Sequence, residues 1–202
     1  VYVSGTSPSF VAHFAEYAKT CVDRLKLKAG DLVVDIGSND GTLLHQFAEL
    51  GMKVLGIDPA RKIANKATQD GIDTWPEFFT QETALKIEAV HGKATLVTAN
   101  NVFAHADDLH EIASSVAELL DPERGRFVFE VQYLIDLVDK TLFDMIYHEH
   151  LSYHSLTPLV SFFNLLGMSL IDAERVNTHG GSIRCTVSPI SDQPRSAQLE
   201  SL

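Results

Sequence analysis

Short apolar runs rich in β-branched residues alternate along this chain with longer segments of helical spacing. The run DLVVDIG at 31–37 predicts a buried strand, and KVLGID at 53–58 predicts a second one. Between them, TLLHQFAEL at 42–50 has its apolar positions at helical spacing and stops at Gly51. Strand, glycine-bearing turn, helix and strand in this order predict a βαβ unit, in which the two strands run parallel.

The alternation of strands and helices continues through the middle of the chain. It predicts a mostly parallel sheet with helices on both faces, because each crossover returns the chain to the same end of the sheet. An amphipathic helix from Ser7-Pro8 to Leu25 is expected before the first strand. The remaining expected elements are a helix over 60–69, a weak strand over 71–75, a helix over 80–90, a strand over 94–100, a helix from Asp107 or Asp108 to Leu120, and a strand over 126–131.

The C-terminal part of the chain has a different pattern. A helix is expected from Thr157-Pro158 to Gly167, followed by two strands, SLIDAERV and SIRCTVSP. The link between these strands, NTHGG, is too short for a parallel crossover, so they should pair antiparallel. We therefore expect an α/β fold with one domain over 1–190, and a polar tail or the start of a further domain over 191–202.

Composition narrows the class of protein without identifying a substrate. The chain has 202 residues, of which 45% are hydrophobic, which suits one domain with a full core. No apolar run is long enough to span a bilayer and no leader pattern is present, so we expect no membrane partner and a cytoplasmic location. The first residue is Val and the tail is polar, which indicates a piece of a longer protein.

Charge and cysteine content exclude two further possibilities. The net charge of −11 argues against nucleic-acid binding, which needs clustered Lys and Arg to displace counterions. A small anionic ligand stays possible, because it needs only a local pocket of donors. Cys21 and Cys185 are far apart in the sequence and indicate neither a disulfide framework nor a cysteine-based zinc site.

The segment VVDIGSNDGTLL carries the first candidate site. Asp35 ends the expected strand, and Gly37 and Gly41 lie in the turn that begins the next helix. Glycines at this point let a ligand approach the backbone at the carboxyl edge of the sheet. The spacing is GxxxG, without the P-loop lysine or the second glycine of GxGxxG, so a triphosphate or a dinucleotide pyrophosphate is poorly served.

Asp58 lies at the tip of the second expected strand and is placed to accept hydrogen bonds from two ribose hydroxyls. Taken one by one, these residues fit an ordinary strand–helix turn and a helix cap better than a ligand site. Their order and spacing, together with the antiparallel ending, resemble motifs I and II of class I S-adenosylmethionine-dependent methyltransferases. The resemblance implies that Asp58 holds the ribose of this cofactor and that the turn from Gly37 to Gly41 holds its methionine part.

Other residues near the same edge are candidates for cofactor contacts. Asn39 and Asp40 either touch the cofactor or cap the helix, with capping favoured for Asp40. Phe78 and Phe79 follow the third expected strand and are candidates to cover an adenine, with core packing open for one of them. Cofactor-binding candidates are Asp35, Gly37, Asn39, Gly41, Asp58, Phe79, Asn100 and Asn101.

The segment MIYHEHLSYHS, residues 145–155, carries the second candidate site, and three interpretations compete for it. In a strand-like segment His148 and His150 share one face, but no spacing specifies which further residue would complete a metal site. A purely structural polar loop is the second interpretation, and it suits His148 and His154 best. The third is an acid–base device, in which a His and a Glu remove a proton next to a ketone and a Tyr stabilises the enolate.

The segments ANNVFAHADDLHEI, FVFEVQYLIDLVDKTLFDMIYHEHLSYHS and VNTHGGSIRC resemble the bacterial sugar C-methyltransferases that act on nucleotide-linked 4-keto-6-deoxyhexoses. The likeness extends from about Tyr2 to Val187. A full chain of that family also carries an N-terminal cysteine-rich zinc domain and a C-terminal Rossmann-like domain. The resemblance therefore implies that this chain is the central methyltransferase domain, with S-adenosylmethionine as cofactor, no metal of its own, and zinc only in the absent N-terminal domain.

Residue by residue, the resemblance implies that His150 is the base that removes the proton at sugar C3. Glu149 and Tyr147 orient or polarise, and His105 lies beside the sugar. Tyr2 corresponds to an active-site tyrosine of that family, and His148 receives no role. His179-Gly180-Gly181 is expected to form a tight turn that lines the pocket.

The expected function is thus C-methylation of a nucleotide-sugar next to its ketone, by a monomer or weak dimer. Two alternatives stay open at this point. An O- or N-methyltransferase on another small molecule would use His150 as base toward a hydroxyl or an amine. A non-catalytic binding module of the same fold would have an empty or blocked cofactor cleft.

Overall fold

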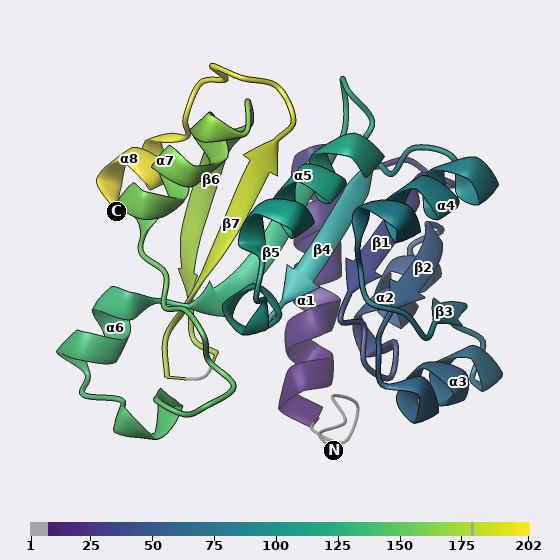
Figure 1. Ribbon diagram of the computed structural model, residues 1–202, viewed down its shortest axis with the longest axis horizontal. Coiled ribbons are helices and arrows are strands. Elements are labelled where there is room, and N and C mark those ends of the chain that lie inside the picture. The colour runs from purple at the N-terminus through teal and green to yellow at the C-terminus, as the bar shows by residue number, and fades with distance from the viewer. Residues whose placement is uncertain (1–7, 179) are drawn as a thin grey trace.

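A computed structural model describes residues 8–178 and 180–202. Seven strands form one sheet in the order β3-β2-β1-β4-β5-β7-β6 (Figure 1). The strands are β1 Leu32–Ile36, β2 Lys53–Ile57, β3 Thr74–Trp75, β4 Leu96–Asn100, β5 Arg126–Gln132, β6 Ser169–Val176 and β7 Ser182–Ser188. The helices are α1 Pro8–Leu25, α2 Thr42–Glu49, α3 Arg61–Gln69, α4 Gln81–His91, α5 Leu109–Leu119, α6 Leu134–Asp139, α7 Leu156–Leu165 and α8 Ala197–Ser201, with short 3₁₀ turns η2 Phe103–His105 and η3 Phe143–Met145.

The pairing of the strands confirms the expected mixed sheet. Strands β1 to β5 pair parallel, and β7 pairs antiparallel with both β5 and β6. The five-residue link between β6 and β7 allows only a hairpin, which is the physical reason for the reversal. In the β5–β7 pair, Glu130 lies opposite Arg184, so one acidic and one basic side chain share a face of the sheet.

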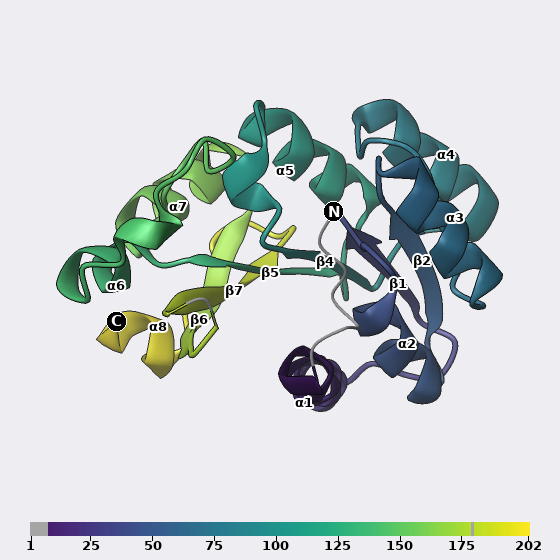
Figure 2. The same ribbon diagram turned by 90° about the horizontal axis from the view of Figure 1, so that it is seen from below.

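Helices cover both faces of the sheet (Figure 2). Helices α1 and α2 lie on one face, and α4, α5 and α7 lie on the other. Successive strand residues point to opposite faces, so Val33 of β1 packs with Tyr17 and Phe47 on the α1 side, while Val34 packs in the core on the other side. This doubly covered sheet explains why the strands read as continuous apolar runs.

Three details differ from the sequence pattern or add to it. Ser155 stands as N-cap of α7, which begins at Leu156, just before the expected Thr157-Pro158. Helix α6 and the turn η3 were not predicted, because their apolar residues have no clear period. Helix α8 lies in the polar tail: Ser196 caps it, and Leu199 is buried where α8 packs against β6.

The N-terminal cap expected at Ser7 lies outside the described residues. Within the described part of the chain, none of the helices combines the length and the apolar character that a bilayer crossing requires.

Candidate active site

The turn between β1 and α2 depends on its two glycines. Gly37 and Gly41 have φ angles of +68° and +76°, a left-handed conformation in which glycine has no steric cost. A Cβ on Gly37 would lie 2.4 Å from Cγ2 of Val102, so the turn and the β4–η2 loop can approach each other only at a glycine. The glycine pattern of the sequence therefore reflects a close backbone approach at the carboxyl edge of the sheet.

Asp58 is held in place by backbone donors from two segments. The backbone N–H of Asn39 donates to Oδ2 and that of Ala60 donates to Oδ1, both at 2.8 Å. The side chain is 7% exposed and lines a cavity. Two lone pairs of the carboxylate are thus used by the protein, and the others are available to hydroxyl groups of a ligand.

Two adjoining cavities lie along this edge, with volumes of about 380 and 520 Å³. They share Gly37, Asn101, Val102 and His105 in their walls, so they form one continuous trough. The larger cavity contains Asp58 and the two phenylalanines, and the smaller one contains Asp35, Ser38, Asn39, Asn100, Tyr147 and Glu149. The trough thus brings together both sequence motifs.

The two phenylalanines divide between a packing position and an exposed one. Phe79 belongs to the hydrophobic core and is 7% exposed, although it also lines the larger cavity. Phe78 lines the same cavity and is 73% exposed. Phe78 therefore has the larger free aromatic surface for an adenine, whereas the assignment from sequence favoured Phe79.

Buried polar atoms in the smaller cavity fit a polar ligand. Among the described residues, neither the amide nitrogen nor the amide oxygen of Asn100 has a hydrogen-bond partner, and the same holds for Oγ of Ser38. Unpaired buried polar groups are costly, so their presence in a cavity wall indicates groups that a ligand satisfies. These residues and Asp58 suit S-adenosylmethionine, whose amino acid part and ribose both need hydrogen-bond partners.

The loops around the trough have unusual backbone conformations and side-chain hydrogen bonds that fix their shape. Asn39 and Asn101 both adopt the left-handed backbone conformation, with φ of 51° and 57°, which Asn tolerates better than most residues. Asp40 accepts hydrogen bonds from the backbone N–H and the hydroxyl of Thr42, the first residue of α2. These bonds tie Asp40 to the first turn of α2, but the N-cap position expected at Asp40 belongs to Gly41.

His150 is oriented by a backbone carbonyl. Its Nδ1 lies 2.8 Å from the carbonyl oxygen of Met145. Because a carbonyl only accepts, Nδ1 carries the hydrogen, and in the neutral ring Nε2 keeps its lone pair. Tyr153 donates to the same carbonyl oxygen at 3.4 Å, so two side chains of the segment are tied to one point of η3.

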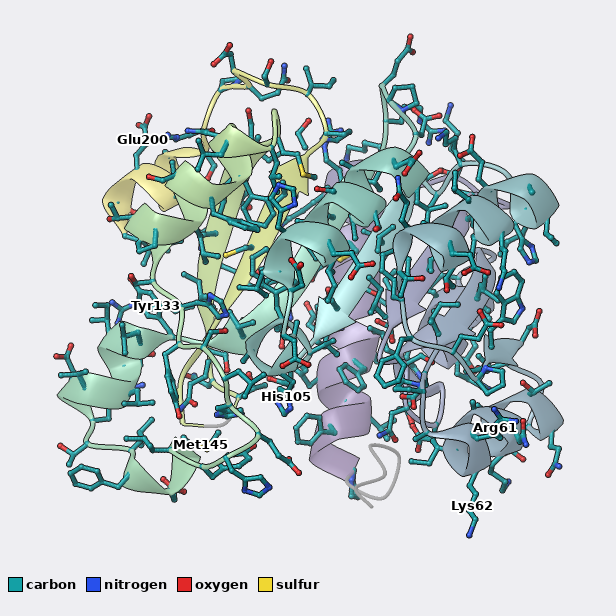
Figure 3. All side chains as sticks on the ribbon, viewed as in Figure 1. Arg61, Lys62, His105, Tyr133, Met145 and Glu200 are labelled. Carbon is teal, nitrogen blue, oxygen red and sulfur yellow. The ribbon has the colours of Figure 1, made fainter. Side chains whose placement is uncertain are left out.

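The other predicted catalytic residues, Tyr147, Glu149 and His105, lie near His150. The ring of Tyr147 is 4.2 Å from that of His150, and the ring of His105 is 5.0 Å away, edge to face. Figure 3 shows His105 and Met145 at this same edge of the molecule. Burial and the neighbouring His150 lower the pKa of His105, which favours its neutral form. Glu149 lines the smaller cavity, with its side chain 60% exposed.

The remaining histidines of the segment have other environments. The His148 side chain is 90% exposed and lines neither cavity of the trough, whereas His150 lines a separate cavity of about 40 Å³ beside the trough. His154 is buried against Phe103 and hydrogen-bonds through Nε2 to Ser152, and burial lowers its pKa. Both positions suit the structural interpretation. Tyr2 and His179, which the sequence also singled out, lie outside the described residues.

Metal ligation was the first of the three interpretations of residues 145–155. Within residues 8–178 and 180–202, no three His, Cys, Asp or Glu side chains are grouped to hold a metal ion.

Sequence reasoning missed one wall of the site. Phe10 and Phe14 of α1 line the smaller cavity, so this helix closes the trough from the side of α2. The amphipathic pattern of α1 shows an apolar face, but it does not indicate that the end of that face extends beyond the core. Ser38 was also missed, because a serine in a glycine-rich turn carries no distinctive signal.

The sheet order and the trough at its carboxyl edge define the fold of class I S-adenosylmethionine-dependent methyltransferases. The chain belongs to the methyltransferase domain family, whose model matches residues 10–173. Magnesium protoporphyrin IX methyltransferase from Synechocystis PCC 6803, solved with bound SAH, superposes with a TM-score of 0.63 at 21% identity, covering 88% of this chain and 82% of that one. At this level of identity, the likeness concerns the fold alone.

Two relatives show closer similarity in sequence. C-methyltransferase NovU from Streptomyces niveus is 41% identical over 188 residues, which is 93% of this chain and 44% of NovU. Ubiquinone biosynthesis O-methyltransferase from Cupriavidus pinatubonensis is 30% identical over 109 residues, covering 53% of this chain and 44% of that protein. The chain thus spans less than half the length of either relative.

Proposed function

We propose that this domain transfers a methyl group from S-adenosylmethionine to a carbon next to the ketone of a nucleotide-linked deoxysugar. Three observations support the proposal: the trough with Asp58 in its wall, the cluster around His150, and the 41% identity to C-methyltransferase NovU. The resemblance of the YHEH and HGGSIR segments to sugar C-methyltransferases supports the sugar as substrate.

The orientation of His150 carries the proposal. Methyl transfer to carbon needs a carbanion or enolate, so a base must first remove a C–H proton. Because Nδ1–H donates to the carbonyl of Met145, the neutral ring is in the tautomer that leaves a lone pair on Nε2. Nε2 can therefore act as this base. Tyr147 and His105 pack against the same ring and restrict its rotation.

The chemistry follows from these residues. Nε2 of His150 accepts the proton, the C–H electron pair moves into the ring carbon–carbon bond, and the ketone oxygen becomes an enolate oxygen. Tyr147 hydrogen-bonds to that oxygen through its phenol, whose pKa is raised by burial and by Glu149, so it remains a donor. The enolate electron pair then forms the bond from the ring carbon to the methyl group that S-adenosylmethionine would supply. The ketone is restored, and the broken S–CH₃ bond would leave S-adenosylhomocysteine. His150 then returns its proton to water.

For the cofactor, we propose that Asp58 binds the ribose hydroxyls, with Phe78 or Phe79 beside the adenine. The turn from Gly37 to Gly41, with Asp35, Asn39, Asn100 and Asn101, holds the methionine part. The support is the shared lining of one trough by residues from separate strand ends. An O-methyltransferase is the second candidate, favoured by the match to the ubiquinone enzyme over half of this chain.

The test of the base is hydrogen exchange in the full-length protein. A nucleoside-diphosphate-linked 4-keto-6-deoxyglucose is incubated in deuterium oxide, and NMR follows deuterium at C3 and C5, the two carbons that flank the ketone. We expect His150→Gln to exchange about 10²-fold or more slowly than wild type. His148→Gln, which changes an exposed histidine two positions away, is the matched control and should exchange at the wild-type rate.

Equal exchange rates in His150→Gln and wild type would rule out His150 as the base. Exchange at C5 instead of C3 would assign C5 as the methylated carbon, and the assignment of His150 as the base would be unchanged. An O-methyl product without a new C–CH₃ carbon would favour the second candidate.

A further inference from the structure

Gln132 ends β5 beside the site, and none of the roles above uses it. It pairs with Ser182 of β7, and the next residue, Tyr133, forms a bridge with His154. Its side chain is buried, with the residue only 6% exposed. Within the described residues, neither its amide nitrogen nor its amide oxygen has a hydrogen-bond partner. Because unpaired buried amides are rare and costly, this one needs a physical explanation.

The environment of Gln132 indicates a ligand. The residue lines a cavity of about 40 Å³ whose wall also contains Asn101, Tyr147 and His150. A water-sized group needs about 10–15 Å³, so the cavity accommodates a single polar group of a larger molecule and no ring. Asn101 and Tyr147 also line the smaller cavity of the trough. The cavity of about 40 Å³ is therefore a side chamber of the trough, next to the proposed base.

The chemistry of the amide selects the group that fits. A carboxamide offers a donor at Nε2 and an acceptor at Oε1, and both are unused here. A ketone oxygen would satisfy the donor and leave the acceptor unpaired. A hydroxyl both accepts and donates, so ring hydroxyls can satisfy the two atoms, whereas an apolar group would satisfy neither.

We propose that Gln132 is a substrate-binding residue that receives a ring hydroxyl of the sugar and thereby positions the neighbouring C–H bond at Nε2 of His150. This inference rests on the proposed function, because it assumes a hydroxylated keto sugar in the trough. It adds a specificity determinant to that function. Sites built to hydrogen-bond a hydroxyl discriminate strongly against analogues that lack it.

The experiment compares wild type with Gln132→Met in the full-length protein, on three substrates. These are nucleoside-diphosphate-linked 4-keto-6-deoxyglucose and its 2-deoxy and 3-deoxy counterparts. Methionine has a similar volume without hydrogen-bonding atoms. Gln198→Met, on the exposed surface of α8, is the control for the same chemical change far from the cavity.

We expect Gln132→Met to lower kcat/KM on the parent sugar about tenfold, the usual scale of one lost hydrogen bond. Wild type should have a higher kcat/KM on the parent sugar than on one of the two deoxy counterparts. In Gln132→Met this difference should disappear. Affinity for S-adenosylhomocysteine and the melting temperature should stay at wild-type values or rise, since an unpaired buried amide is replaced by an apolar group.

Three outcomes would overturn the inference: unchanged kcat/KM, an equal loss on all three sugars, or a lowered melting temperature that shows a structural role. Wild-type protein that methylates none of the three sugars would instead contradict the proposed function and remove the substrate assumed here. If wild type is active and Gln132→Met behaves identically, the role of Gln132 is contradicted, but the proposed function is not.

Discussion

Asp35 shows how burial changes the chemistry of a single residue. It is the next-to-last residue of β1, is 4% exposed, and accepts a hydrogen bond from the hydroxyl of Thr98 at 2.6 Å. Burial, with a further contribution from the charge of Asp58, raises the pKa of Asp35 from 3.8 to about 7, although Thr98 opposes the shift. A ligand cation in the smaller cavity would favour the charged form and lower this pKa again.

The raised pKa of Asp35 lowers the free energy of unfolding by an amount that depends on pH. Below pH 4 the folded and unfolded chains both hold the proton, and there is no penalty. Between the unfolded value of 3.8 and the folded value of about 7, only the unfolded chain ionises, so the free energy of unfolding falls as the pH rises. Above the folded pKa the penalty is complete, and at about 1.4 kcal/mol per unit it is on the order of 4 kcal/mol.

We therefore predict that Asp35→Asn is more stable than wild type at neutral pH. Its advantage in free energy of unfolding should grow by about 2–3 kcal/mol between pH 5 and pH 8, as measured by urea unfolding. Asp73→Asn, at an exposed position, is the control. An advantage that does not change with pH would show that Asp35 is already ionised in the folded protein.

At the scale of elements, a buried ionic network ties α1 to the antiparallel half of the sheet. Glu130 of β5 accepts from Arg184 of β7 at 2.7 Å and lies 3.0 Å from Nε2 of His13 on α1. Arg184 also bonds Glu174 of β6 at 2.9 Å and lies 4.2 Å from the centre of the Tyr17 ring. The network therefore positions the helix whose Phe10 and Phe14 close the trough.

Glu130 remains ionised because of these partners. Burial by itself would raise its pKa, but the hydrogen bond from His13 and the charge of Arg184 outweigh burial and hold the pKa below its ordinary value. The stabilisation linked to Glu130 is thus present above its unfolded pKa and is lost as the pH falls through the lower, folded value.

We predict that Arg184→Met lowers the free energy of unfolding by about 3–5 kcal/mol, because it leaves Glu130 buried without its main partner. Denaturant unfolding measures the effect. The Glu130→Gln/Arg184→Met double variant should lose less than the single Arg184→Met variant. Arg24→Met, which removes an exposed member of the same group, should cost under about 1 kcal/mol. A loss in Arg184→Met no larger than in Arg24→Met would contradict the anchoring role.

At the scale of the whole molecule, one trough receives a contribution from the carboxyl ends of β1, β2 and β4. The two cavities adjoin through Gly37, Asn101, Val102 and His105, so a ligand that occupies both contacts all three strand ends. Cofactor binding should therefore stabilise the fold as a unit, because the ligand contacts loops from several strands at once.

We predict that S-adenosylhomocysteine at about 100 times its Kd stabilises this chain by about 2.7 kcal/mol. For a domain of this size, the melting temperature should rise by about 5–10 °C. A thermal-shift assay measures it. Asp58→Ala should remove most of the shift at the same ligand concentration, whereas the exposed Asp73→Ala should keep it. No shift in wild type would favour a blocked cofactor site.

Much of the architecture was predictable because it depends on local patterns. Apolar runs such as DLVVDIG predicted the buried strands, and the short NTHGG link predicted the antiparallel hairpin. The meeting of Gly37 and Asp58 was also predictable, since strand ends meet at one edge of a parallel sheet, whereas Gly41 lies against Ile72 and lines neither cavity. Helices α6 and α8 were not, because their positions depend on contacts such as that of Leu199 with the core, which no local period reveals.

By itself, the sequence determined the order of the elements, the mixed sheet and the edge at which its polar residues meet, because periodicity and loop length act locally. Only the tertiary structure decided which neighbours each side chain has. It bonds Nδ1 of His150 to the Met145 carbonyl, places Phe78 in the open and Phe79 in the core, buries Glu130 against Arg184, and leaves the Gln132 amide unpaired beside the proposed base. These are long-range contacts, and burial, tautomer and pKa all depend on them.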